Sequence, residues 1–334
     1  MDEMIGGDPG ASPLSGGSGA ILERADQFID KVGAKISFVG RILSRTELSS
    51  RSLLLMVLAL FLLLILPPLI RRLMIRFKWT RSNFRDEVIP QSFGVVIVLF
   101  TGMMLAATAR LYPSYLPQAK LWLVAVLGFG VLGLLDDLKG DKQIKGLRGH
   151  FAAAAKGKFT TGFLKAVGGI LLALFLSWKI HGSDSVRLLL DAALIALSAN
   201  FINLLDLRPG RAGAVFLVLG GAILLFGIRT QGAFSGVSPL LFVALAALVV
   251  YERDARATVM LGDVGSNTLG ACLGLALAQS ACPLVLRGVF VVLLLGIHLI
   301  AERLSLTKLI AEKPLLRTLD ALTGVRVQAS TKKS

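Results

Sequence analysis

The stretch KLWLVAVLGFGVLGLLDDLK, residues 120–139, decides how the chain is interpreted. It is an apolar run of nearly the length that a helix needs to cross a bilayer, and it ends at two adjacent acids, Asp136 and Asp137. Acids beside the hydrocarbon region are costly unless water, a cation or a partner compensates them. The pair therefore marks a candidate functional site. The alternative is an ordinary helix end whose acids are simply solvated.

The composition indicates an integral membrane protein. The chain has 334 residues, of which 54% are hydrophobic, and its mean hydropathy is +0.74. Apolar runs of about 20 residues recur along it, which excludes a soluble globular domain. The formal net charge is +15, but Lys and Arg gather in alternate loops, as in membrane proteins, and do not form a nucleic-acid footprint. The expected partners are the membrane, anionic lipid head groups and phosphorylated substrates, and nucleic acid is excluded.

The predicted fold is all-α, a polytopic transmembrane helical bundle of about nine spans preceded by an amphipathic helix. Residues 1–20 are rich in Gly, Ser and Pro and have linker-like composition. Residues 21–46 repeat apolar positions at helical spacing and predict the amphipathic helix. Residues 52–304 form the predicted transmembrane domain, and residues 305–334 a basic tail. The expected spans are approximately 52–70, 91–109, 120–136, 163–180, 187–204, 212–228, 237–251, 267–283 and 286–302.

The distribution of basic residues predicts the orientation of these spans. Lys and Arg are concentrated after the first, third and ninth spans and are sparse in the opposite loops. The positive-inside rule therefore places the N-terminus outside and the C-terminus in the cytoplasm of a multi-pass protein of the cell membrane. Three polar clusters then share the cytoplasmic face: Asp136–Asp137, Asn200–Asp206 and Gly262–Asn267.

The second cluster contains Asn200, Asn203 and Asp206, which are spaced three residues apart. On a helix this spacing puts the three side chains on one face, where they can point at one site. The alternative is a set of interhelical hydrogen bonds, because Asn often joins helices in membrane bundles.

The third cluster is the turn Gly262-Asp263-Val264-Gly265. Its glycines allow close backbone approach to a ligand, and the helix N-terminus that follows would offer free N–H groups to a phosphate. The alternative is a loop turn with a capping aspartate.

Together the clusters supply the four acids Asp136, Asp137, Asp206 and Asp263. Hard oxygen ligands without a Cys or His cluster suit Mg²⁺. Basic residues beside the acids suit a diphosphate, so the pattern predicts phosphoryl transfer at a membrane face. A transporter would also use intramembrane acids, but its site is expected near the bilayer midplane, whereas these acids share one face. The basic residues that flank the acids are Lys142, Lys145, Arg148, Arg208 and Arg211.

Several motifs together resemble a known family. They are Gly133-Leu-Leu-Asp136-Asp137 with Lys145-Gly146-Leu147, Asn200-Phe-Ile-Asn203-Leu-Leu-Asp206, and Gly262-Asp263-Val264-Gly265-Ser266. In order and spacing they are similar to the polyprenyl-phosphate N-acetylhexosamine-1-phosphate transferases. The resemblance covers about residues 52–310.

The resemblance implies that the phosphate of polyprenyl (undecaprenyl) phosphate attacks the β-phosphate of a UDP-sugar at the cytoplasmic membrane face. UMP leaves, Mg²⁺ assists, and the product serves cell-wall or surface-glycan biosynthesis. A homodimer is left open. By match to the motifs, Asp263 resembles the metal ligand. The catalytic residues would be Asp136, Asp137 and Asp206, and the substrate-binding residues Lys139, Lys145, Asn200, Asn203, Arg208 and Arg211.

The chain departs from the family pattern at two places. Many members carry a second acid where this chain reads Asp206-Leu-Arg208-Pro209-Gly210. The family's histidine-rich segment is replaced by residues 310–317, and its tenth span has no counterpart in the sequence. These departures keep a second interpretation open, a catalytically silent homologue that acts as a membrane scaffold or a lipid-phosphate binder.

Overall fold

The computed structural model describes residues 49–139, 149, 153–232 and 236–325. The predicted linker-like stretch 1–20 and amphipathic helix 21–46 lie outside these residues. The chain divides into two units, Met1–Leu54 and Leu55–Ser334. The architecture below is that of the second unit.

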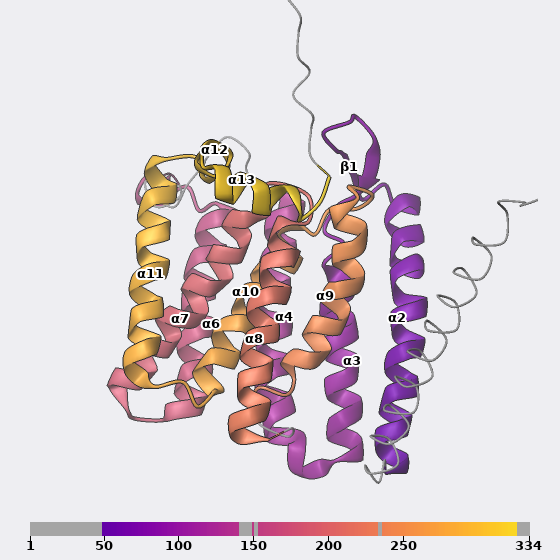
Figure 1. Ribbon diagram of the computed structural model, residues 1–334, viewed down its shortest axis with the longest axis vertical. Coiled ribbons are helices and arrows are strands. Elements are labelled where there is room, and N and C mark those ends of the chain that lie inside the picture. The colour runs from indigo at the N-terminus through magenta and orange to yellow at the C-terminus, as the bar shows by residue number, and fades with distance from the viewer. Residues whose placement is uncertain (1–48, 140–148, 150–152, 233–235, 326–334) are drawn as a thin grey trace, which may run out of the picture. The chain divides into compact units, whose positions relative to one another are not determined.

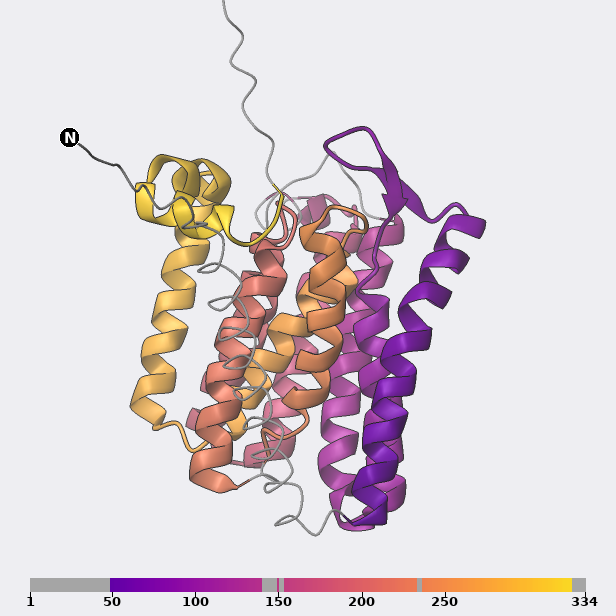
Figure 2. The same cartoon turned by 45° about the vertical axis from the view of Figure 1, so that its right-hand side comes forward.

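Long helices form a bundle (Figures 1 and 2). Among the described residues each predicted span corresponds to one helix. Six helical segments are long and apolar enough to cross a membrane, namely Ser50–Arg76, Pro113–Lys139, Thr161–His181, Ser185–Leu205, Arg211–Gln231 and Leu284–Arg303. The chain is thus a helical membrane protein, while the number and orientation of its spans stay predictions. The helices are α2 (Ser50–Arg76), α3 (Val95–Leu111), α4 (Leu116–Lys139), α6 (Thr161–His181), α7 (Ser185–Leu205), α8 (Arg211–Gln231), α9 (Leu240–Ala255), α10 (Gly262–Gln279) and α11 (Leu284–Arg303).

The all-α prediction is wrong in one detail, because a short antiparallel hairpin follows α2. Strand β1 (Thr80–Ser82) pairs with β2 (Val88–Pro90). The Asn83 side chain closes the turn, since its Oδ1 accepts the backbone N–H groups of Arg85 and Glu87. Such Asn side chains stabilise turns because they mimic a backbone carbonyl. The hairpin is joined to the segment before α10 by the Met260 N–H, which donates to the carbonyl oxygen of Pro90.

Helix α10 is the buried centre of the bundle. Every residue from Val264 to Ala276 is buried, and its most extensive packing is against α7 and α4. Two glycines permit the close contact with α7, because an added Cβ at Gly270 would lie 2.2 Å from the Ser198 carbonyl oxygen, and one at Gly274 would lie 2.6 Å from the Cα of Ile195. Small residues serve this purpose between membrane helices. The predicted eighth span is therefore surrounded by protein.

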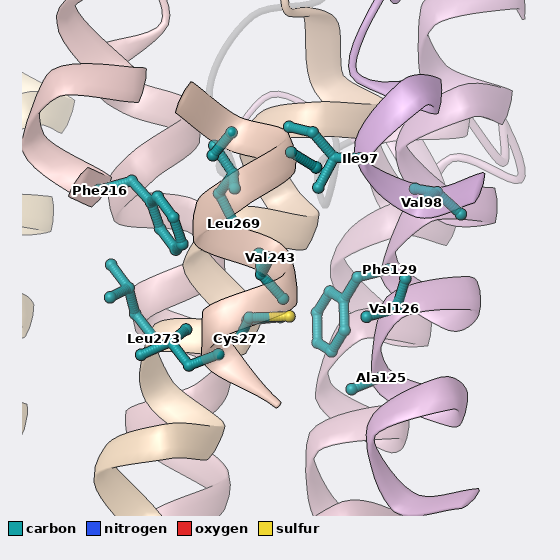
Figure 3. Close-up of a cluster of buried hydrophobic side chains, with 14 of the residues drawn as sticks. Ile97, Val98, Ala125, Val126, Phe129, Phe216, Val243, Leu269, Cys272 and Leu273 are labelled. Atoms are coloured by element: carbon teal, nitrogen blue, oxygen red, sulfur yellow. The ribbon is translucent and has the colours of Figure 1, made fainter. Parts of the chain in front are cut away.

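Apolar side chains from several helices fill the space around α10 (Figure 3). Phe129 of α4, Phe216 of α8, and Leu269 and Cys272 of α10 belong to this cluster. All four side chains are buried. This packing holds the start of α10 at one end of the bundle, the end that carries the acids.

Two short helices follow α11. They are α12 (Leu306–Glu312) and α13 (Pro314–Ala321), and they lie at the same end of the bundle as the hairpin (Figure 1). The described part of the predicted basic tail, residues 305–325, thus contains two helices.

We expect Gly270→Ala to destabilise the protein, because the new methyl group would overlap the α7 backbone and overpacking costs about 1–3 kcal/mol. The matched control is Gly221→Ala on α8, where an added Cβ has no neighbour within 4 Å. That control should be neutral or slightly stabilising, because Ala restricts the unfolded chain more than Gly. The measurement is the thermal unfolding midpoint in detergent. Equal midpoints for the two variants would contradict the close α7–α10 contact.

Candidate active site

The four acids meet where several helices begin or end at one end of the bundle. Asp136 and Asp137 lie in the last turn of α4, Asp263 in the first turn of α10, and Asp206 directly follows α7. Asp206 was expected on the α7 helix face with Asn200 and Asn203. It is instead the C-cap residue, because α7 ends at Leu205.

Asp137 caps α10. Its Oδ1 accepts the Asp263 N–H at 3.0 Å, and its Oδ2 accepts the Val264 N–H at 3.2 Å. A carboxylate at a helix N-terminus satisfies unpaired N–H groups and interacts favourably with the helix dipole. The expectation that these N–H groups are free to bind a phosphate is therefore wrong. Gly262, at φ 73°, makes this turn possible, since an added Cβ there would lie 2.8 Å from the Asp137 carboxylate.

Lys165, on α6, joins two of the acids and was missed by the sequence analysis. Its ammonium donates to Asp136 Oδ2 at 2.6 Å and also to Asp263 Oδ2. The Asp136 side chain accepts a second hydrogen bond, from the Thr161 hydroxyl at 2.7 Å. The signal was present, because Lys165 lies inside an expected span, where an ionisable residue counts as functional by default. Its partners could not be read from the sequence.

Asp206 lies in strongly negative surroundings. Removal from water raises its pKa well above the ordinary carboxyl value, and the nearby carboxylates of Asp254, Asp263 and Asp137 raise it further. Asp254, also missed by the sequence analysis, is buried at the end of α9. The site therefore holds more negative charge than Lys165 compensates.

Amide and hydroxyl side chains form hydrogen bonds between α7 and α10 and within α10. The Ser266 hydroxyl donates to Asn203 Oδ1 at 2.9 Å, and Asn267 Nδ2 donates to the Asp263 carbonyl at 2.7 Å. Asn203 thus helps to place the N-terminal part of α10, and Asn200, one turn earlier on α7, is half-buried.

The predicted basic contacts have different surroundings. Lys139 is exposed at the end of α4, and Arg208 is half-buried in the loop after Asp206. Arg211 is 4% exposed, and its guanidinium pairs with Asp320 of α13. Lys145 lies outside the described residues. Lys139 and Arg208 thus stay close to the acids in the sequence, whereas Arg211 has a structural partner.

Comparisons with known proteins agree with the motifs. The model of the family described as "Glycosyl transferase family 4" matches residues 119–281, and this range contains all four acids. The relatives are phospho-N-acetylmuramoyl-pentapeptide-transferases. That of Shouchella clausii (strain KSM-K16) is 27% identical over 267 residues, covering 72% of this chain and 78% of the relative. That of Chlamydia trachomatis serovar L2 is 28% identical over 244 residues, covering 66% and 68%. That of Geobacter sp. (strain M21) is 27% identical over 281 residues, covering 73% and 77%.

The chain is similar to Glycosyl transferase family 4 over residues 119–281 and to these transferases, which supports the polyprenyl-phosphate hexosamine-1-phosphate transferase family. The resemblance seen in the motifs is thereby confirmed. The interpretation of the chain as an enzyme is confirmed as well, because the relatives are named transferases.

The donor set of this transferase fits Mg²⁺. Among the described residues no group of three or more His, Cys, Asp or Glu side chains is arranged to hold a metal ion. Mg²⁺ does not require such a cage, because it commonly binds one or two carboxylates together with substrate phosphates. Asp136 and Asp263 are two such carboxylates, and the negative charge that raises the pKa of Asp206 is what a divalent cation would offset.

Asp206→Asn should stabilise the transferase at neutral and alkaline pH. The folded-state pKa of Asp206 is raised, so ionising this carboxyl costs stability, and that cost grows as pH rises from the unfolded-state pKa through the folded-state pKa. Asn carries no charge and removes the cost. The measurement is the thermal midpoint of both proteins in EDTA across pH. The stabilisation should vanish below about pH 4, where the aspartate of the unfolded chain is also protonated. A pH-independent difference would contradict the electrostatic origin.

Lys165→Met should destabilise the protein, because it leaves the charges of Asp136 and Asp263 uncompensated. The Lys165 side chain is 19% exposed, so the expected loss of roughly 1–3 kcal/mol lies between the values for exposed and buried ion pairs. Added Mg²⁺ should recover more stability in this variant than in the wild type. Lys179→Met, which removes an exposed lysine from the same helix, is the control. An identical response of the thermal midpoint to Mg²⁺ in Lys165→Met and the wild type would contradict this prediction.

Proposed function

We propose that the protein transfers a sugar-1-phosphate from a UDP-sugar to polyprenyl (undecaprenyl) phosphate at the cytoplasmic face of the cell membrane and releases UMP. One observation carries the proposal. Lys165 joins Asp136 and Asp263 at the ends of three membrane-protein helices, beside Asp206. Carboxylates that can hold a divalent cation, together with an ammonium group, suit a reaction between two anionic phosphates, because positive charge must offset the repulsion between the two phosphates.

The reaction is a displacement at phosphorus. A phosphate oxygen of the lipid forms a bond to the β-phosphorus of the UDP-sugar, and the bond from that phosphorus to the oxygen bridging the two phosphates breaks. The bridging oxygen leaves with UMP, and the sugar remains on the lipid through a diphosphate. Positioning and charge compensation supply most of the catalysis in such transfers.

The side chains of this chain supply position and charge. Lys165, a flexible ammonium shared between two acids, can shift toward a substrate phosphate. Exposed Lys139 and half-buried Arg208 flank the acids and suit the diphosphate. Asp137 holds Asp263 in place through the backbone of α10. Asp136 and Asp263 would hold Mg²⁺, which when bound supplies positive charge against the phosphates.

Exposed apolar side chains beside the site support a lipid substrate. Leu138, next to the aspartate pair on α4, is 52% exposed, and Leu164, next to Lys165 on α6, is 53% exposed. Large apolar side chains with such exposure suit contact with hydrocarbon. A polyprenyl chain in the bilayer would lie against α4 and α6 with its phosphate beside Asp136 and Lys165.

The test is release of UMP from a panel of UDP-sugars by the purified protein with polyprenyl phosphate and Mg²⁺. We expect release from one sugar, and its loss in EDTA. Asp263→Asn should lower the rate by about 100-fold or more, the typical effect of removing a group that stabilises transition-state charge. Glu252→Gln, which changes an exposed side chain on α9, should leave the rate unchanged.

Two results would contradict the proposal. Full turnover by Asp263→Asn would show that the site has been assigned wrongly. Silence across the panel, with polyprenyl phosphate still bound, would favour the scaffold or lipid-phosphate binder over the enzyme.

A further inference from the structure

The C-terminal segment Leu306–Val325, hereafter the C-terminal clamp, is fastened to the loop that carries Asp206. Arg211, the first residue of α8, is 4% exposed. Its Nε donates to Asp320 Oδ1 at 2.6 Å, and its Nη1 donates to the Thr307 hydroxyl at 3.4 Å. Both short helices of the clamp therefore contact one buried guanidinium.

The end of the clamp also packs directly on backbone. The Val325 N–H donates to the Ala255 carbonyl at 2.8 Å. An added Cβ at Gly210 would lie 1.9 Å from the Thr323 carbonyl oxygen, and one at Gly324 would lie 2.5 Å from the Pro209 carbonyl oxygen. These contacts leave no room between the clamp and the loop after Asp206.

Asp254 holds the same loop by a separate contact. Its Oδ2 accepts the Gly210 N–H at 2.7 Å, and its Oδ1 accepts the Leu261 N–H at 3.1 Å. Leu261 directly precedes the Gly262–Asp263 turn. The loop after Asp206 is thus fixed between Asp254 and the clamp, and Asp254 ties it to the turn that carries Asp263.

The charge of Arg211 explains why the clamp is needed. A guanidinium at the first position of a helix is unfavourably placed in the helix dipole, and a buried charge is costly without a partner. Asp320 supplies that partner. The sequence predicted that Arg211 binds substrate. Because Arg211 is buried and paired, it is poorly placed to contact a substrate phosphate.

We propose that the C-terminal clamp positions Asp206 for the reaction, and that Arg211 and Asp320 are positioning residues and not substrate contacts. The effect on transfer rests on the proposed function, whereas the effect on the loop does not.

The experiment combines kinetics with hydrogen exchange on the full chain. Asp320→Ala and Arg211→Ala should speed amide exchange in residues 207–214 and lower kcat by about 10- to 100-fold, since small displacements of a reacting group have effects of this size. KM for the UDP-sugar should change little. The charge-swapped pair Arg211→Asp with Asp320→Arg should restore both slow exchange and turnover. Asp320→Asn is the milder variant if the alanine variants do not fold.

The control is Glu252→Ala, which breaks the exposed ion pair between Glu252 of α9 and Arg256, the residue that follows α9; Glu252 Oε1 and Arg256 Nη2 are 3.0 Å apart. It should leave exchange and turnover unchanged. Unchanged loop exchange in Asp320→Ala, or faster exchange with full kcat, would overturn the proposal. So would a charge-swapped protein that regains slow exchange but stays inactive, because Arg211 would then be needed by the substrate.

Failure of the proposed function has a different signature. The wild-type protein would then release no UMP from any UDP-sugar. The exchange of residues 207–214 in Asp320→Ala would still decide whether the clamp holds the loop.

Discussion

The site depends on the two hydrogen bonds between the Asp137 carboxylate and the first turn of α10. They fix the end of α4 to the start of α10, and because Asp263 lies in that turn, they also fix the distance between the acids. The adjacent residue, Asp136, is left to face α6 and Lys165. The two neighbouring acids thus have different roles. Asp137 caps the helix backbone, and Asp136 belongs to the charged cluster. A capping interaction of this kind is worth only about 0.5–2 kcal/mol, but it decides which charges meet.

The burial of α10 makes this arrangement useful. A helix that faced lipid would need an apolar surface, whereas α10 is surrounded by protein and can carry Ser266, Asn267 and Thr268 in its second turn, all of them buried. Those side chains form hydrogen bonds with α7 or with α10 itself, so these buried polar groups have protein partners and do not depend on water. Asp263 therefore lies at the start of a buried helix, which limits the positions that its carboxylate can take.

Local patterns were sufficient to predict the helices and the acids. Hydropathy identified the expected spans because a membrane helix is a local feature of about 20 residues, and the motifs identified Asp136, Asp206 and Asp263 because each is a short run. The pairing of side chains could not be predicted in this way. Lys165 and Asp263 are 98 residues apart, and Arg211 and Asp320 are 109 residues apart. Such pairs depend on the packing of whole helices. The hairpin was missed for a similar reason, since its three-residue strands are stabilised by contacts with the segment before α10.

Two cations near the acids differ in a way that separates structure from chemistry. Arg211 is buried, and its planar guanidinium donates hydrogen bonds to both Asp320 and Thr307. Moving the guanidinium would therefore leave Asp320 without this partner and disturb the loop. Lys165 is partly exposed and carries a point charge on a flexible stem, shared between two acids that it can leave one at a time. An arriving phosphate can therefore attract Lys165 without unfolding any element, whereas it could attract Arg211 only by breaking the clamp. On the proposed function, the buried charge of Arg211 therefore serves the fold, and the partly exposed charge of Lys165 is the one that can meet the anionic substrates.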